Sequence, residues 1–163
     1  MKSLLFAPFV LLACHCTADA QQPVPSRKPP VGIPSDAKFF NGKWYRVYLE
    51  KTSWHSARDK CKALSGQLVI VPDAATWEFV KSLANGPNLW LGATDEVTQG
   101  VWKWVDGTPV EFNGAWEINQ PDNLGGKQHY VAINRNKRWD DMEKVERAGP
   151  NQIGGYICEW KDK

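Results

Sequence analysis

Large apolar and polar residues alternate at 44–48, which read W-Y-R-V-Y, and this pattern is typical of a half-buried strand. A helical pattern follows, because apolar residues recur there at spacings of three and four. These residues are Trp54, Ala57, Cys61 and Leu64. Gly66 marks the expected end of this helix. The pattern therefore predicts a strand and then a helix whose core-facing side carries Cys61.

A second helical pattern runs over 72–84 and is ended by N-G-P at 85–87. After it the pattern changes to strands and long polar loops. The strand candidates are 89–93, 101–105, 130–133, 137–139 and 155–160. Residues 106–128 are rich in Gly, Asn, Pro and Asp and are too polar to form core. A loop of this length inside a compact domain is usually functional or disordered.

The N-terminus has the order of features that signal peptidase recognises. Lys2 precedes an apolar run at 4–13, which is too short to span a bilayer, and A-D-A follows at 18–20. We predict that residues 1–20 are a signal peptide and that the protein is secreted. An alternative is a lipoprotein signal, because an L-L-A-C sequence ends at Cys14 and would leave that cysteine lipidated.

The predicted mature chain divides into a proline-rich linker at 21–38 and a folded domain at 39–163. Two of the four cysteines lie in the predicted signal, so Cys61 and Cys158 remain. We expect these two to form a disulfide, since an exported protein meets oxidising conditions. Such a bridge closes nearly the whole domain, which the chain-entropy treatment values at about 4–5 kcal/mol.

Composition narrows the function classes. The formal net charge of +2 gives no electrostatic footprint for nucleic acid or for an anionic membrane. The nine tryptophans are the unusual feature, because this side chain can fill a core or stack on a flat ligand. We expect most of them to lie in the core.

A series of landmarks follows one order along the chain. They are Cys61 on the first helix, L-W-L-G at 89–92, W-K-W-V-D-G at 102–107, Q-P-D at 120–122, W-D-D at 139–141 and Y-I-C-E-W at 156–160. Together they resemble the C-type lectin family, which has W-I-G-L, a Q-P-D or E-P-N triplet, W-N-D and a terminal cysteine. The resemblance covers roughly 43–160. It implies an α+β, C-type-lectin-like fold of two helices, small twisted antiparallel sheets and a long ligand-binding loop region.

The resemblance also implies a calcium ion held jointly by the loop triplet and the W-N-D strand. Calcium takes six to eight oxygen ligands, which carboxylates and amide carbonyls supply. Pro121 resembles the family's cis-proline. Carried over position by position, the implied ligands are Gln120, Asp122, Gln128, Asp140 and Asp141. This set has three carboxylates and two amides, the same count as in mannose-type members.

The sequence departs from the mannose-type pattern at the positions that would contact sugar. In that family each of two sugar hydroxyls meets an acid and an amide, and here both pairs are kept but reversed. The implied carbohydrate-binding residues are Gln120, Asp122, Gln128 and Asp140, with Trp116 as a stacking ring. We hypothesise that the double reversal accepts mannose-like hydroxyl geometry again. Packing beneath the loop is an equal alternative for Trp116.

An enzyme is not expected from the residues. No serine or cysteine nucleophile lies in an activating context. Asp140 and Asp141 are adjacent, so on a strand they point to opposite faces and do not make a facing carboxylate pair. We predict calcium-dependent binding of a carbohydrate or glycoconjugate. The alternative is a lectin-like module that recognises a protein or a surface without sugar.

Overall fold

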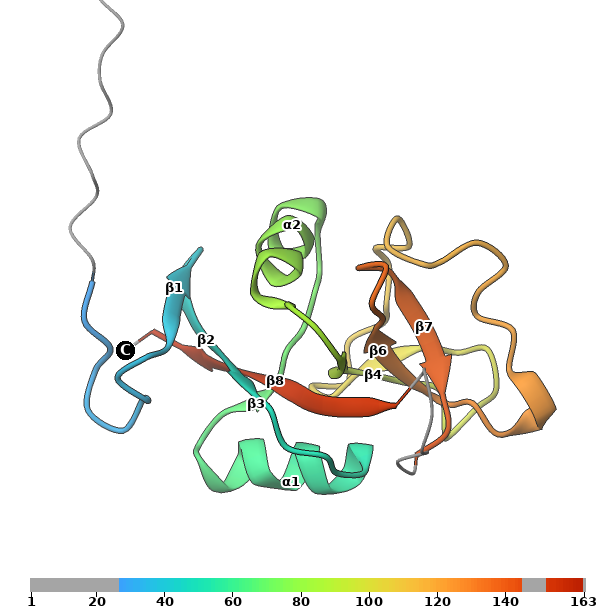
Figure 1. The fold of residues 1–163 in the computed structure, drawn as a ribbon, viewed down its shortest axis with the longest axis horizontal. Coiled ribbons are helices and arrows are strands. Elements are labelled where there is room, and N and C mark those ends of the chain that lie inside the picture. Colours follow the sequence, from blue (N-terminus) through green and yellow to red (C-terminus); the bar gives the residue numbers. More distant parts are fainter. Residues whose placement is uncertain (1–26, 145–151, 163) are drawn as a thin grey trace, which may run out of the picture.

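The computed structural model describes residues 27–144 and 152–162 (Figure 1). The predicted signal peptide at 1–20 lies outside the described residues, and the boundaries of the predicted segments stay predictions. The elements before the middle of the chain are β1 (Lys38–Phe40), β2 (Lys43–Tyr48), α1 (Trp54–Ala63), β3 (Gln67–Leu68) and α2 (Ala74–Leu83). The later elements are β4 (Asn88–Thr94), β5 (Lys103–Trp104), the 3-10 turn η1 (Leu124–Gly126), β6 (Tyr130–Ile133), β7 (Trp139–Met142) and β8 (Ile153–Lys161).

Both predicted helices are confirmed, and side chains cap their N-termini. Ser53 Oγ accepts a hydrogen bond from the backbone N–H of Ser56 at 3.3 Å. Asp73 Oδ1 accepts one from Thr76 N at 2.7 Å. These contacts satisfy N–H groups that the first helical turn leaves without partners. In the part of the chain that the structure covers, no helix is long and apolar enough to cross a membrane.

The strands form one mixed sheet in the order β1-β2-β8-β4-β6-β7, with β3 added beside β8 and β5 beside β4. The predicted antiparallel pairing holds except between β4 and β8, which run parallel. Parallel neighbouring strands need a long crossover connection. Here the connection is the part of the sequence between the end of β4 and the start of β8. The last strand of the chain thereby lies between β2 and β4 in the middle of the sheet.

The two helices cover opposite faces of the central strands (Figure 1). Alternate residues of β8 belong to different core clusters: Ile157 packs with the α2 side, whereas Tyr156 and Cys158 pack with the α1 side. The predicted Cys61–Cys158 disulfide is present, with a Cα–Cα distance of 5.6 Å. It joins α1 to β8 inside the second cluster. The sheet therefore has a buried core on each side.

Two strand predictions need correction. The strand expected at 137–139 is wrong, because Lys137 adopts a left-handed conformation with φ of 57° in a turn. Asn134 Oδ1 accepts hydrogen bonds from the backbone N–H of both Asn136 and Arg138, which closes that turn before β7 begins. The strand expected at 101–105 is reduced to the two residues of β5.

Tryptophan packing agrees with the prediction. Seven of the nine rings are buried, and Trp102 and Trp116 pack partly buried against the core.

The end of the predicted linker also contacts the domain. Arg27 pairs with Asp162 at 2.5 Å and its guanidinium lies 4.6 Å from the ring centre of Phe39.

Candidate calcium and carbohydrate site

The predicted long loop, residues 106–128, lies on the side of the molecule away from the linker and the C-terminus (Figure 1). Apart from the short turn η1 it has no regular elements. The Gln120–Pro121 peptide bond is cis, as the sequence predicts. Asp122 and Leu124, on either side of Asn123, are exposed. Earlier in the loop Ala115 is buried and Phe112 and Trp116 pack against the core, so polar contacts are needed mainly to fix the exposed stretch after the cis bond.

Three predicted ligands meet at one short stretch of backbone. Gln120 Oε1 accepts a hydrogen bond from Asp122 N at 2.9 Å. The backbone N–H of Leu124 lies within bonding distance of both Asp122 Oδ1, at 3.1 Å, and Gln128 Oε1, at 2.6 Å. The side chains of Gln120, Asp122 and Gln128 are therefore neighbours, as the sequence predicts.

Asp141 on β7 connects this stretch to the sheet. Its carboxylate is fully buried and accepts hydrogen bonds from the backbone N–H of Asp122, at 3.1 Å, and of Asn123, at 2.8 Å. Burial raises the pKa of this carboxyl, while the two backbone donors act in the opposite direction. Asp141 thus fixes the position of the loop as well as being a predicted ligand.

Asp140 is the remaining predicted ligand and is partly exposed. Its pKa is raised from 3.8 to about 6, first by burial and then by the negative charges of Asp141 and Asp122. Repulsion is a smaller cause than burial, and a hydrogen bond with the Asn134 side chain acts in the opposite direction. Hydrogen bonds therefore bring four predicted residues together where the loop meets β7, namely Gln120, Asp122, Gln128 and Asp141, and Asp140 adjoins them as the neighbour of Asp141 on that strand.

The chemistry of this donor set suits a hard cation, because it consists of carboxylate and amide oxygens alone. The acidic side chains of this set alone do not form a metal site. Within 27–144 and 152–162, no three His, Cys, Asp or Glu side chains are grouped so that they could hold a metal ion. Both Asp141 oxygens face backbone N–H groups, as described above. Calcium coordination by the five residues stays a prediction.

Trp116, within the loop, packs partly buried against the core and contacts other rings. Its ring centre is 5.3 Å from that of Trp102 and 5.5 Å from that of Trp139, in edge-to-face geometry. Edge-to-face pairs of this kind stabilise aromatic clusters. These contacts favour the packing alternative for Trp116, and its stacking on a sugar stays a prediction.

Sequence reasoning missed Asp95, Gln99 and Asn123, which hydrogen-bond around the predicted ligands. Asp95 is buried and lies within 2.9 Å of His129, the neighbour of Gln128. The available signal was an acidic residue placed directly after a strand that is mostly apolar, where an uncompensated buried charge would be costly.

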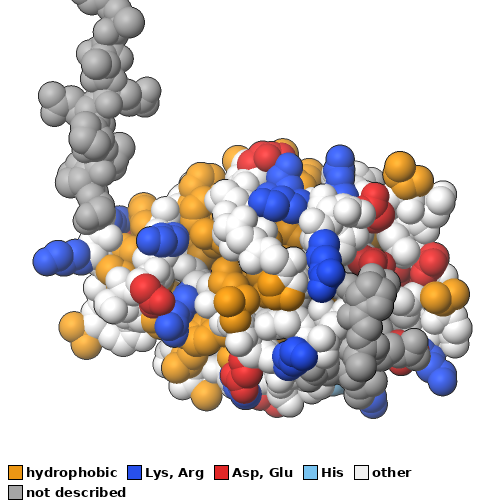
Figure 2. All heavy atoms as spheres, viewed as in Figure 1, with side chains coloured by type: hydrophobic (Ala, Val, Ile, Leu, Met, Phe, Trp, Pro, Cys, Tyr) orange, Lys and Arg blue, Asp and Glu red, His pale blue; other side chains and the backbone are white. Residues whose placement is uncertain are grey.

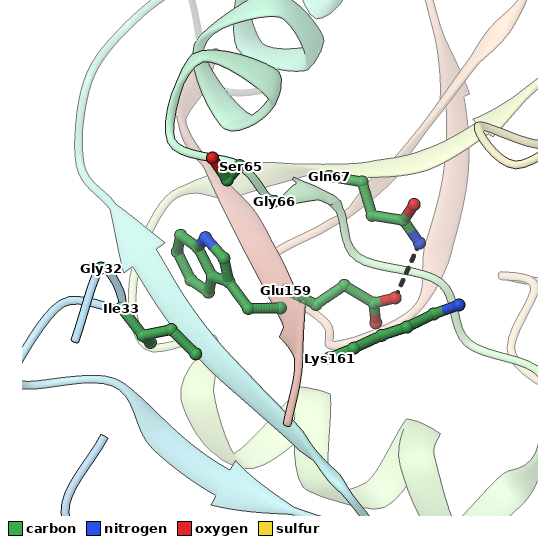
Figure 3. A pocket seen from close by; sticks show the side chains of 8 residues that line it. Gly32, Ile33, Ser65, Gly66, Gln67, Glu159 and Lys161 are labelled. Atoms are coloured by element: carbon green, nitrogen blue, oxygen red, sulfur yellow. Dashed lines mark hydrogen bonds between the residues drawn. The ribbon is translucent and has the colours of Figure 1, made fainter. Parts of the chain in front are cut away.

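A hollow of about 310 Å³ lies elsewhere, between residues 32–33 and the end of α1 (Figure 3). Glu159 lines it and is directed toward the Gln67 amide, which donates to Oε1 at 2.9 Å. Lys43 Nζ also donates to Oε1, at 2.7 Å. Because this buried acid has partners within the fold, the hollow shows no polar group that calls for a ligand.

Charge on the surface is mixed. Figure 2 shows lysine and arginine side chains dispersed among acidic ones on the face in view, without a continuous basic field. This distribution agrees with the small net charge and offers no footprint for a phosphate backbone on that face.

Comparison with known proteins identifies relatives. A family model described as the lectin C-type domain matches residues 50–159. The chain is similar to "C-type lectin domain family 4 member F" of Rattus norvegicus, with 38% identity over 93 residues, which is 55% of this chain and 17% of that protein. It is 30% identical to "Hepatic lectin" of Gallus gallus over 123 residues, or 75% of this chain and 56% of that one. The chain therefore spans less than two thirds of the length of either relative.

The fold is also similar to solved structures. The carbohydrate-recognition domain of the mouse scavenger receptor C-type lectin aligns with a TM-score of 0.72 and 28% identity, covering 81% of this chain and 100% of that one. This agreement confirms the predicted α+β arrangement, with two helices and a mixed sheet.

Proposed function

Because the chain belongs to the C-type lectin domain family, a family of non-enzymatic binding domains, we propose that it binds carbohydrate through a calcium ion. The observation that supports this proposal is a set of oxygen-bearing side chains where the loop meets β7, four of which are connected by hydrogen bonds. The set consists of Gln120, Asp122, Gln128, Asp140 and Asp141. We infer that the protein works as a binding domain toward glycoconjugates.

Electrostatics supports a cation at this junction. Burial is the main cause of the raised pKa of Asp140, and repulsion by the charges of Asp141 and Asp122 adds to it. A divalent cation would convert that repulsion into attraction, because each carboxylate then faces a positive charge. Two amide oxygens, from Gln120 and Gln128, complete the oxygen set without adding charge.

The same side chains would orient a sugar. A bound calcium supplies coordination positions for two neighbouring hydroxyl oxygens. Around each hydroxyl the carboxylate accepts a hydrogen bond and the amide NH₂ donates one. Gln120 with Asp122 forms one acid–amide pair, and Gln128 with Asp140 forms the other. Both pairs are reversed relative to mannose-type members, so we propose binding of mannose-like hydroxyl pairs. A glycan array that returned galactose-type ligands alone would contradict this specificity.

Export of the domain is part of the proposal. The Cys61–Cys158 disulfide is stable in an oxidising compartment, and the apolar N-terminal run would direct the chain there. Lipid anchoring through Cys14 is the alternative, and mass spectrometry of the mature N-terminus distinguishes the two.

A calcium titration tests the proposed site. Asp122→Asn removes one of three carboxylates while keeping the side-chain size, so we expect the calcium dissociation constant to rise at least about tenfold. Glu111→Gln is the matched control, since it removes an exposed carboxylate from the same loop but outside the site. Calorimetry that finds no calcium binding by the wild type, or equal binding by Asp122→Asn, contradicts the proposal.

A second candidate function is recognition of a protein or a surface without sugar. Ile118 and Leu124 flank the triplet and are 82% and 69% exposed, so apolar side chains border the site. Binding that EDTA and free sugar both abolish supports the lectin. Binding that is indifferent to free sugar supports this alternative.

A further inference from the structure

A chain of hydrogen bonds between protein groups links the end of β4 to the proposed calcium ligands. It begins at Asp95, whose side chain is fully buried directly after that strand. Asp95 Oδ1 lies 2.9 Å from His129 Nδ1. Asp95 Oδ2 accepts hydrogen bonds from Gln99 Nε2 at 3.1 Å and from Gly100 N at 2.7 Å. This buried carboxylate is therefore fully engaged by the turn and by the start of β6.

The backbone of Asp95 is fixed as well. Its N–H donates to His129 O at 3.2 Å, and its carbonyl accepts from Thr98 N at 3.0 Å. The strand before it, β4, is buried from Asn88 to Ala93. Asp95 is thus an anchor attached to the rigid part of the fold.

Asn123 forms the other end of the chain. Its Nδ2 donates to Gln99 Oε1 at 2.6 Å, and its Oδ1 accepts from Gln128 N at 3.0 Å. Its own N–H donates to Asp141 Oδ2 at 2.8 Å. The residue lies between Asp122 and Leu124 and has a φ of 45°, a left-handed conformation that asparagine tolerates. One side chain therefore contacts both Gln99 and a proposed ligand.

We propose that Asp95, Gln99 and Asn123 are positioning residues, which hold the calcium ligands in place before the ion binds. The hydrogen bonds of these three residues carry the positioning role. Its consequence for calcium affinity rests on the proposed function. Residues 124–127 are exposed and add little apolar burial, so polar contacts must order this stretch. A site ordered in advance loses less conformational entropy on binding and therefore binds more tightly.

Gln99→Met is the variant that breaks the chain. Methionine has a similar length but neither donates to Asp95 nor accepts strongly from Asn123. Val97→Ala is the matched control, because Val97 lies in the same turn and is 92% exposed. Two quantities are measured on the full mature chain: amide hydrogen exchange over residues 120–128 in EDTA, and the calcium dissociation constant.

In EDTA we expect the amides of Asp122 and Asn123 to be protected in the wild type and in Val97→Ala. They should exchange about tenfold faster in Gln99→Met. The calcium dissociation constant should rise about tenfold in Gln99→Met alone, while the melting temperatures of both variants in EDTA match within about a degree. A merely structural role would lower the melting temperature and leave calcium affinity unchanged.

Unprotected amides in the wild type, or equal exchange in Gln99→Met and Val97→Ala, would overturn the inference. If the wild type binds no calcium, the proposed function fails, and the exchange data still decide whether these residues order the loop. If the wild type binds calcium and Gln99→Met binds it equally well, the positioning role alone is overturned.

Discussion

The helix-covered half of the sheet and the long loop at 106–128 are ordered by different forces. The first has a buried core on both faces and a disulfide that joins α1 to β8. In the second, Phe112, Ala115 and Trp116 pack on the core, whereas the candidate site at 120–128 is fixed by hydrogen bonds between polar side chains and backbone N–H groups. Apolar burial gives large stability at many positions, whereas each hydrogen bond adds about 1 kcal/mol net. The fold and the binding site are therefore stabilised almost independently.

β7 is the place where the two regions meet. Trp139 and Asp141 point to the buried side of this strand, whereas Asp140 between them is only partly buried. Trp139 contributes a ring to the core, and Asp141 contributes a carboxylate to the loop. Substitutions in β7 can therefore distinguish the packing of the core from the hydrogen bonding of the loop.

Removing the disulfide should have the largest effect and should fall on the first region. Cys61→Ser with Cys158→Ser opens a bridge between residues 97 apart in sequence, which frees the unfolded chain. We expect the free energy of unfolding to fall by about 4–5 kcal/mol in urea titrations. A loss below about 1 kcal/mol would show that the core alone determines the stability of this half.

Truncating Trp139 should come next and should disturb both regions. Its ring contacts the rings of Trp77, Trp104, Phe112 and Trp116 at centre distances of 5.5–5.8 Å. Trp139→Ala should cost about 3–5 kcal/mol. Trp139→Phe should cost clearly less, because it keeps a ring and removes a buried N–H that has no hydrogen-bond partner among the described residues. Equal losses in the two variants would contradict the packing role.

The difference between the regions also explains what the sequence could predict. The helices follow from apolar spacing and capping residues, because these signals are local. The disulfide follows from cysteine count, because two cysteines remain after the predicted signal. The turn at Lys137 was missed because it is closed by a side-chain hydrogen-bond acceptor, Asn134. The parallel pairing of β4 with β8 is a long-range choice that no local pattern carries.

The candidate site shows the same division. Family motifs gave all five proposed ligands, and hydrogen bonds connect Gln120, Asp122, Gln128 and Asp141. Asp95 and Gln99 were missed because they lie far from the triplet in sequence and reach the proposed ligands only through contacts with Asn123 and His129. Hydrogen-bond partners of this kind become visible only when the chain is folded.

Acid should stabilise the calcium-free loop slightly. The pKa of Asp140 is raised to about 6 in the folded state from an ordinary 3.8. The folded state therefore binds this proton more tightly, and stability is lost as the pH rises through about 6. After discounting for partial exposure we expect about 1 kcal/mol. Melting curves in EDTA should show this slope between pH 4 and 7, and Asp140→Asn should remove it. A slope that is unchanged in Asp140→Asn would assign the titration to another group.

Arg27→Ala should have the smallest effect and tests where the first region begins. The Arg27–Asp162 pair is on the surface, with the Arg27 side chain 52% exposed. We expect a loss of about 0.2–1 kcal/mol, reduced at high salt. A loss of stability confirms that this end of the predicted linker belongs to the folded unit, and no loss places it outside.

Thermal melting in calcium and in EDTA tests the central claim most directly, because it asks whether an ion binds to and stabilises the loop site while the core is stable without one. With calcium at ten to a hundred times its dissociation constant, binding should add about 1.4–2.7 kcal/mol, or several degrees. The gain should persist in Glu111→Gln and disappear in Asp122→Asn. If the wild type melts at the same temperature in calcium and in EDTA, the calcium site is contradicted, and with it the calcium-dependent binding of sugar.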